Sequence, residues 1–120
     1  MEFNFNNESP IYIQLVETLM LAIVKEEYPI GSKLPSVRDL ALTAKVNPNT
    51  MQKALNELEE KGLIYTERTN GKYVTKDKKL IEKTKNNLAK EIVNKYITSM
   101  NNIGFSKEES LFYLQTIGGK

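Results

Sequence analysis

The chain has 120 residues, of which 40% are hydrophobic and 27% are charged, and its formal net charge is +2. This size suits one domain with a small appendage, and the absence of both cysteine and histidine excludes disulfides, the usual zinc sites and histidine-based catalysis. No apolar run approaches the roughly 18 residues that span a bilayer, and the N-terminal sequence MEFNFNNESP lacks the regions of a signal peptide. We therefore expect a cytoplasmic protein with no membrane contact, no metal site and no cofactor.

The charges are distributed unevenly along the chain. Residues 1–75 contain eight Lys or Arg and ten Asp or Glu, whereas residues 76–120 contain nine Lys or Arg and five Asp or Glu. A nucleic-acid surface in the first part must therefore depend on a local group of cations rather than on net charge. The candidate cations are Lys33, Arg38, Lys53, Arg68 and Lys72.

The first predicted helix follows a polar, Asn-rich arm that covers residues 1–8. Ser9 is the predicted N-cap and Pro10 the first helical residue, where its missing N–H has no cost. The helix is expected to end near Glu26, before a turn at residues 28–31. Its apolar residues recur at three- and four-residue steps and are expected to face the core: Ile13, Val16, Leu19, Met20, Ile23 and Val24.

Two short helices separated by a tight turn are predicted between Lys33 and Glu60. Ser36, with Asp39 three residues later, forms an acidic variant of the capping box. The helix that follows is expected to end near Thr43, before a turn at residues 44–46.

The second of these helices begins with Asn47 as its N-cap and Pro48 in its first turn, and it ends before Gly62. Four residues fall at i, i+3, i+4 and i+7 and must face the core: Met51, Ala54, Leu55 and Leu58. The opposite face is polar, with Thr50 and Gln52 at its sides: Asn49, Lys53, Asn56 and Glu60. This layout is typical of the helix-turn-helix, whose second helix enters the DNA major groove.

A short hairpin is predicted directly after this helix. Residues 63–67 and 72–75 are strand-like, and Asn70-Gly71 between them is a strong signal for a tight turn. A hairpin in this place is typical of the wing of a winged helix. Tyr65 and Tyr73 are interpreted as strand-packing residues rather than base-stacking ones.

The last part of the chain is predicted to form two helices. The longer runs from about Leu80 to Met100, Gly104 ends it, and Ser106 with Glu109 forms a capping box that opens the last helix. Their apolar residues are expected to pair two copies of the chain through Ile81, Leu88, Ile92, Tyr96, Met100, Leu111 and Leu114. The predicted fold is therefore mainly α with a small β-hairpin wing: a flexible arm (1–8), a winged helix-turn-helix (9–76) and a two-helix dimerisation region (77–120).

The sequence resembles the GntR family of winged-helix regulators at many separate positions between residues 10 and 74. The matching residues are Pro10-Ile11-Tyr12, Gln14-Leu15, Gly31, Lys33-Leu34-Pro35-Ser36, Arg38, Leu40-Ala41, Val46-Asn47-Pro48-Asn49-Thr50, Lys53-Ala54, Leu58-Glu59, Gly62 and Gly71. The short tail is similar to that of the YtrA subfamily, in which the tail mainly forms a homodimer.

The resemblance implies DNA contacts from the start of each helix of the helix-turn-helix and from the wing. The implied residues are Lys33, Ser36, Arg38, Asn47, Asn49, Thr50, Gln52, Lys53, Asn70, Gly71 and Lys72. Arginine can bridge phosphates or bind a guanine edge, asparagine can pair with adenine, and threonine can meet a phosphate or a thymine methyl. The wing departs from the G-x-G-x-[FY]-V run common in the family, and Pro48 and Gln52 stand where many relatives carry arginine, so base contacts are expected to differ.

Several of these side chains also have simpler interpretations that the sequence leaves open. Asn47 can be an N-cap only, Arg38 a member of a surface salt bridge, Gln52 a solvated residue and Lys72 a charge that solubilises the turn. The stripe on the long helix can line a ligand pocket near Tyr96 instead of a dimer seam.

The leading hypothesis is a homodimeric, sequence-specific transcription regulator, expected to be a repressor, that binds double-stranded DNA at a pseudo-palindromic operator. By family analogy, its target is expected to be a transporter operon. The alternative is a winged-helix protein-interaction module that does not read DNA, which the acidic excess in residues 1–75 favours. An enzyme is not expected, and no motif identifies a small-molecule effector.

Overall fold

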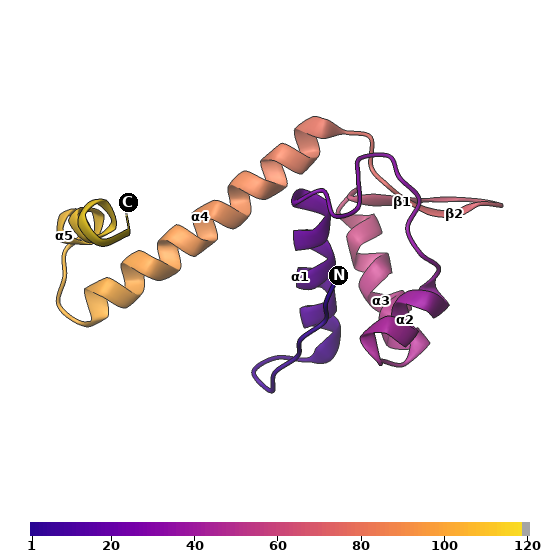
Figure 1. Ribbon diagram of the computed structural model, residues 1–120, viewed down its shortest axis with the longest axis horizontal. Coiled ribbons are helices and arrows are strands. Elements are labelled where there is room, and N and C mark those ends of the chain that lie inside the picture. The colour runs from indigo at the N-terminus through magenta and orange to yellow at the C-terminus, as the bar shows by residue number, and fades with distance from the viewer. Residues whose placement is uncertain (119–120) are drawn as a thin grey trace. The chain divides into compact units, whose positions relative to one another are not determined.

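The structure is a computed structural model that describes residues 1–118 and consists of two compact units, a first unit of residues 1–83 and a second unit that begins at Thr84. The predicted fold class is confirmed, because the described chain is mainly helical with one two-stranded antiparallel sheet (Figure 1). The elements in chain order are α1 (Ile11–Val24), α2 (Val37–Ala44), α3 (Pro48–Glu60), β1 (Ile64–Glu67), β2 (Gly71–Val74), α4 (Lys78–Asn102) and α5 (Lys107–Tyr113), followed by a π-helical turn over Leu114–Gly118.

The start of α1 differs from the prediction. Pro10, not Ser9, occupies the N-cap position and makes no side-chain capping bond, so the helix begins at Ile11. The buried Gln14 side chain holds this region instead, because its Nε2 donates to the Ser9 carbonyl at 2.7 Å and to the Asn6 carbonyl at 3.0 Å. Its Oε1 accepts the Asn6 N–H at 3.0 Å. One amide side chain therefore fastens the N-terminal arm to α1 at Asn6.

The core of the first unit forms between α1 and α3, which pack against each other. α1 ends at Val24, before the predicted Glu26, because Glu26 adopts a left-handed conformation with φ 61°. The periodicity assigns Ile13 to the core, but its side chain is 36% exposed. Leu15, which the periodicity does not assign to the core, is fully buried. The largest buried side chains of the two helices are Leu15, Leu19, Ile23, Met51, Leu55 and Leu58.

The hairpin after α3 is confirmed, in a register that pairs Tyr65 with Tyr73 and Glu67 with Gly71. The two tyrosine rings stack with their centroids 5.6 Å apart, as expected for strand-packing residues. The connection consists of residues 68–70 and is not a two-residue Asn-Gly turn, because Gly71, with φ +102°, already pairs with Glu67.

The loop before α2 runs alongside β2 and forms backbone hydrogen bonds with it. The Leu34 N–H donates to the Lys72 carbonyl at 2.8 Å, and the Val74 N–H donates to the Ser32 carbonyl at 2.9 Å. Lys33, between the two loop residues, lies opposite β2 in an isolated bridge. The loop that leads into α2 and the wing are therefore fixed to each other by backbone hydrogen bonds.

The first turns of α4 belong to the first unit. Ile81, which the sequence assigns to the dimer stripe, is only 5% exposed, because its own chain covers it. Nearby, Gly62 has φ +79°, and a Cβ at this position would lie 3.2 Å from Cδ2 of Leu80. Glycine is therefore favoured by the backbone conformation after α3, and a side chain here would also press on Leu80 of α4.

The second unit contains the rest of α4 and α5. The predicted capping box is confirmed, since the Ser106 Oγ accepts the Glu109 N–H at 3.1 Å and the Glu109 Oε1 accepts the Ser106 N–H at 2.9 Å. The Tyr96 hydroxyl donates to the Ser110 carbonyl at 2.6 Å and so ties the two helices together. Residues 119 and 120 of the predicted dimerisation region lie outside the described residues.

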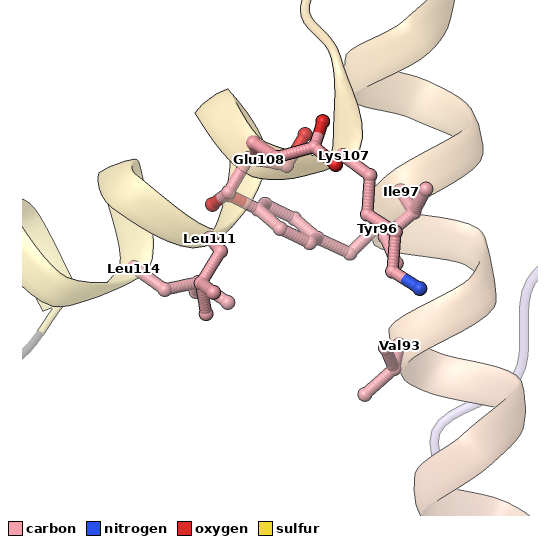
Figure 2. Close-up of a pocket in the computed structure, with 8 residues that line it drawn as sticks. Val93, Tyr96, Ile97, Lys107, Glu108, Leu111 and Leu114 are labelled. Atoms are coloured by element: carbon pink, nitrogen blue, oxygen red, sulfur yellow. The ribbon is translucent and has the colours of Figure 1, made fainter.

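Between α4 and α5 lies an apolar groove of about 320 Å³. Figure 2 shows Val93, Tyr96 and Ile97 of α4 on one side of it and Leu111 and Leu114 on the other. Many apolar side chains around it are exposed, among them Ile92, Val93, Leu111, Phe112, Leu114 and Ile117. Within residues 1–118, no helix is both long and apolar enough to cross a membrane.

Candidate nucleic-acid interface

Side-chain caps determine where α2 and α3 begin. The Ser36 Oγ accepts the Asp39 N–H at 3.0 Å, and the Asn47 Oδ1 accepts the Asn49 N–H at 2.7 Å. Lys45 ends α2 in a left-handed conformation with φ 59°. Both predicted caps are therefore present, and the chain turns sharply between the two helices, as a helix-turn-helix requires.

α3 has one buried face and one polar face, as its periodicity predicts. Its four core residues, Met51, Ala54, Leu55 and Leu58, are each 0% exposed. Asn49, Lys53 and Asn56 are exposed on the other face, and Thr50 and Gln52 are half-buried at its edges. The core thus holds α3 in one rotation about its axis, with a mostly neutral polar surface turned outward.

Several side chains on this polar surface have partners within the chain. The Gln52 Nε2 donates to the Asn56 Oδ1 at 2.8 Å, and the Lys53 Nζ lies 4.0 Å from the centre of the Tyr12 ring of α1. Exposed contacts of these kinds contribute little free energy, so a base edge or a phosphate can replace them. Asn47 is an N-cap through its Oδ1, which leaves its amide nitrogen as a donor.

A concave surface of about 640 Å³ lies beside α2, between the loop that precedes it and the wing. Residues 33–37 and Asp39 line one side, and residues 66–72 line the other. The Lys33 side chain crosses Gly71, since a Cβ at Gly71 would lie 3.4 Å from the Lys33 Cε. A larger residue at Gly71, where φ is +102°, would strain the backbone beside this lysine.

Three exposed cations lie on the elements around this concave surface: Lys33, Arg38 and Arg68. Within the described part of the chain, none of them has an ion pair or a side-chain hydrogen bond. They are a local positive group in a unit that is not basic on average, which is what a phosphate-binding surface requires here.

Lys72 differs from these cations. Its Nζ lies 3.4 Å from the Glu59 Oε1 and donates to the Thr66 Oγ1 at 2.9 Å, and its side chain is only 15% exposed. The strand register explains this position, because Lys72 pairs with Thr66 and lies beside α3 rather than at the tip of the wing. Asn70 is the residue in the exposed connection, where its N–H donates to the Glu67 carbonyl at 3.3 Å.

A capped helix-turn-helix, a second helix with a polar outer face and an adjoining hairpin define a winged-helix DNA-binding domain. The chain belongs to the GntR family, because the model for "Bacterial regulatory proteins, gntR family" matches residues 11–74. The protein is therefore a DNA-binding transcriptional regulator, and the family resemblance seen in its sequence is confirmed.

Two relatives from Bacillus subtilis (strain 168) indicate where in the family the chain lies. YhcF, an uncharacterized HTH-type transcriptional regulator, is 34% identical over 116 residues, which cover 97% of this chain and 96% of YhcF. The HTH-type transcriptional repressor YtrA is 41% identical over 73 residues, which cover 61% of this chain and 56% of YtrA. The similarity to YhcF thus includes the C-terminal helices.

Solved structures share this architecture. A GntR family transcriptional regulator from Listeria monocytogenes superposes with a TM-score of 0.87 at 42% identity, covering 94% of this chain and 99% of that chain. The DNA-binding domain of AraR in complex with operator ORX1 superposes with a TM-score of 0.57 at 25% identity, covering 62% of this chain and 96% of that chain. The first match thus includes nearly the whole chain, and the second covers a smaller part.

Proposed function

We propose that the protein is a homodimeric transcriptional repressor that binds a pseudo-palindromic operator through α3, the start of α2 and the wing. The observation that carries this proposal is the polar face of α3, which the core holds outward, in the same unit as the unpaired cations Lys33, Arg38 and Arg68. The name of YtrA as a repressor and the operator complex of the AraR domain support it.

In this proposal α3 reads bases and the surrounding residues bind the backbone. Asn49, Thr50 and Gln52 offer amide and hydroxyl groups to base edges, since such groups can pair with adenine or reach a thymine methyl. Arg38 binds a phosphate or a guanine edge with its planar guanidinium. Further contacts to DNA come from Lys33, Ser36, Asn47, Lys53, Arg68, Asn70 and Gly71.

The exposed apolar residues of the second unit support the proposed dimer. Contiguous apolar surface of this kind usually marks an interface. The proposed seam contains Leu88, Ile92, Tyr96, Met100, Leu111 and Leu114, and it omits Ile81, which is already buried. A two-fold dimer presents two copies of α3, so its operator contains two half-sites in inverted orientation.

The operator can be identified by selection from a random-sequence duplex library, followed by footprinting on the promoter of the chain's own operon. A gene for a membrane transporter is the target that we expect to find at that locus. An absence of any selected sequence, at low salt, would contradict the proposal.

Arg38→Ala tests the proposed interface directly. This change should weaken binding to the selected duplex by about 1–3 kcal/mol. Lys25→Ala is the matched control, because Lys25 follows α1 and pairs with Glu27 outside the concave surface.

Binding to the selected duplex should also weaken steeply as the salt concentration rises, since phosphate contacts release counterions. Salt-independent binding would favour the protein-interaction module instead.

A further inference from the structure

A closed polar cluster joins the wing to α3. The Lys72 Nζ approaches the Glu59 Oε1 at 3.4 Å and the Thr66 Oγ1 at 2.9 Å, and the Thr66 hydroxyl donates to the Glu59 Oε1 at 2.8 Å. Each of the three side chains thus contacts the other two. The donors and acceptors match, because the lysine only donates, the carboxylate only accepts, and the hydroxyl does both.

The three residues come from three different elements. Glu59 lies near the end of α3, Thr66 is on β1, and Lys72 is the residue paired with Thr66 on β2. A two-stranded hairpin is only marginally stable by itself and needs packing against another element. The tyrosine pair stacks the strands on each other, but the cluster is the described hydrogen-bonded link between the hairpin side chains and α3.

Burial separates Lys72 from the other cations of the region. Its side chain is 15% exposed, whereas Lys33, Arg38 and Arg68 are exposed and unpaired within the described residues. Two of the three N–H donors of the Lys72 ammonium already face Glu59 and Thr66, so a phosphate would compete with these partners for a largely buried group. A phosphate that drew the ammonium away would leave the Glu59 carboxylate without its cation near the negative DNA backbone.

We infer that Lys72 is a positioning residue, which holds the wing at a set angle to α3 through Glu59 and Thr66, and that it does not bind a phosphate. The held wing places Arg68 and Lys33 so that they contact the DNA backbone while α3 lies in the major groove. This inference rests on the proposed DNA interface, and it replaces the direct DNA contact that the family resemblance implies for Lys72 with a positioning role.

The test uses the full chain with three changes, Lys72→Met, Glu59→Ala and the two combined. Methionine keeps most of the apolar stem of lysine and removes the ammonium. Glu17→Ala is the control, because Glu17 lies on α1, is exposed and has no ion pair among the described residues. The probes are the selected duplex and a scrambled duplex of the same composition, with affinity measured by fluorescence anisotropy over a range of salt and the folded fraction by circular dichroism.

Each single change should weaken binding to the selected duplex roughly fivefold to tenfold, the effect of losing about one charge-assisted hydrogen bond. The combined variant should be no weaker than either single variant, because both changes break the same cluster. Binding to the scrambled duplex should also weaken, and any fall in the salt slope should be the same in Lys72→Met and Glu59→Ala, because both changes release the same cations, Arg68 and Lys33, from the DNA backbone. Glu17→Ala should bind the selected duplex as tightly as wild type.

The direction of the change in DNA affinity caused by Glu59→Ala distinguishes the two roles of Lys72. If Lys72 bound a phosphate, removal of Glu59 would free the lysine and strengthen binding, and Lys72→Met would reduce the salt slope by about 0.9 whereas Glu59→Ala would not. Either result overturns the inference, and so does a loss that equals the loss of folded protein. Arg38→Ala separates the two levels: an effect of Arg38→Ala without an effect of Lys72→Met overturns this inference alone, whereas no effect of either contradicts the proposed interface.

Discussion

The two units of this protein differ in how far their apolar side chains are buried. In the first unit, one chain shields the whole interface between α1 and α3, and residues such as Leu55 are fully buried. In the second unit, Ser110 is the buried residue among residues 84–117, and Ile92 is 66% exposed. Hydrophobic periodicity therefore predicts which face of a helix is apolar, but it does not say whether the same chain or another one covers that face.

The largest expected effect is on the core of the first unit, which a single chain buries by itself. Leu55→Ala removes a fully buried side chain from α3 and should lower the free energy of unfolding by about 2–5 kcal/mol. Asn56→Ala, at the next and exposed position, should change it by no more than about 0.5 kcal/mol. Urea unfolding followed by circular dichroism measures both, and equal losses would contradict the described core.

The next change tests the second unit, where a second copy of the chain is proposed to cover the exposed apolar seam. Ile92→Asp would bury an unpaired carboxylate in the seam, which costs several kcal/mol, so the dimer dissociation constant should rise by at least about a hundredfold. Asn94→Asp adds the same charge about 200° around α4 and should leave the dimer intact. Sedimentation velocity distinguishes monomer from dimer. A dimeric Ile92→Asp protein would place the seam elsewhere, and a monomer with undiminished operator affinity would contradict the doubled site.

The smallest expected effect separates the two roles of Asn47. Asn47→Ala removes the cap of α3 and should lower the free energy of unfolding by about 1 kcal/mol, whereas Asn47→Ser supplies another capping oxygen and should stay within a few tenths of wild type. If the Asn47 amide also contacts DNA, both variants bind the selected duplex more weakly than wild type. Full recovery of affinity in Asn47→Ser would show that Asn47 is only a cap.

Local features of the fold could be predicted from the sequence, because they depend on a few neighbouring residues. The Ser36, Asn47 and Ser106 caps each join a side chain to a backbone N–H within three residues. The two faces of α3 follow from its period alone. Ser9 is an exception at this scale: it forms no cap, and its carbonyl accepts a hydrogen bond from the Gln14 side chain.

The partners of charged side chains could not be predicted, because they depend on strand register and helix packing. The sequence by itself determined that a polar helix face and a wing would stand together with a few cations. Only the tertiary structure decided that Lys72 turns to Glu59, that Lys53 lies on the Tyr12 ring and that Ile81 is covered by its own chain. Residues 13 and 41 positions apart meet in the first two contacts, and no local period or propensity carries information over that separation.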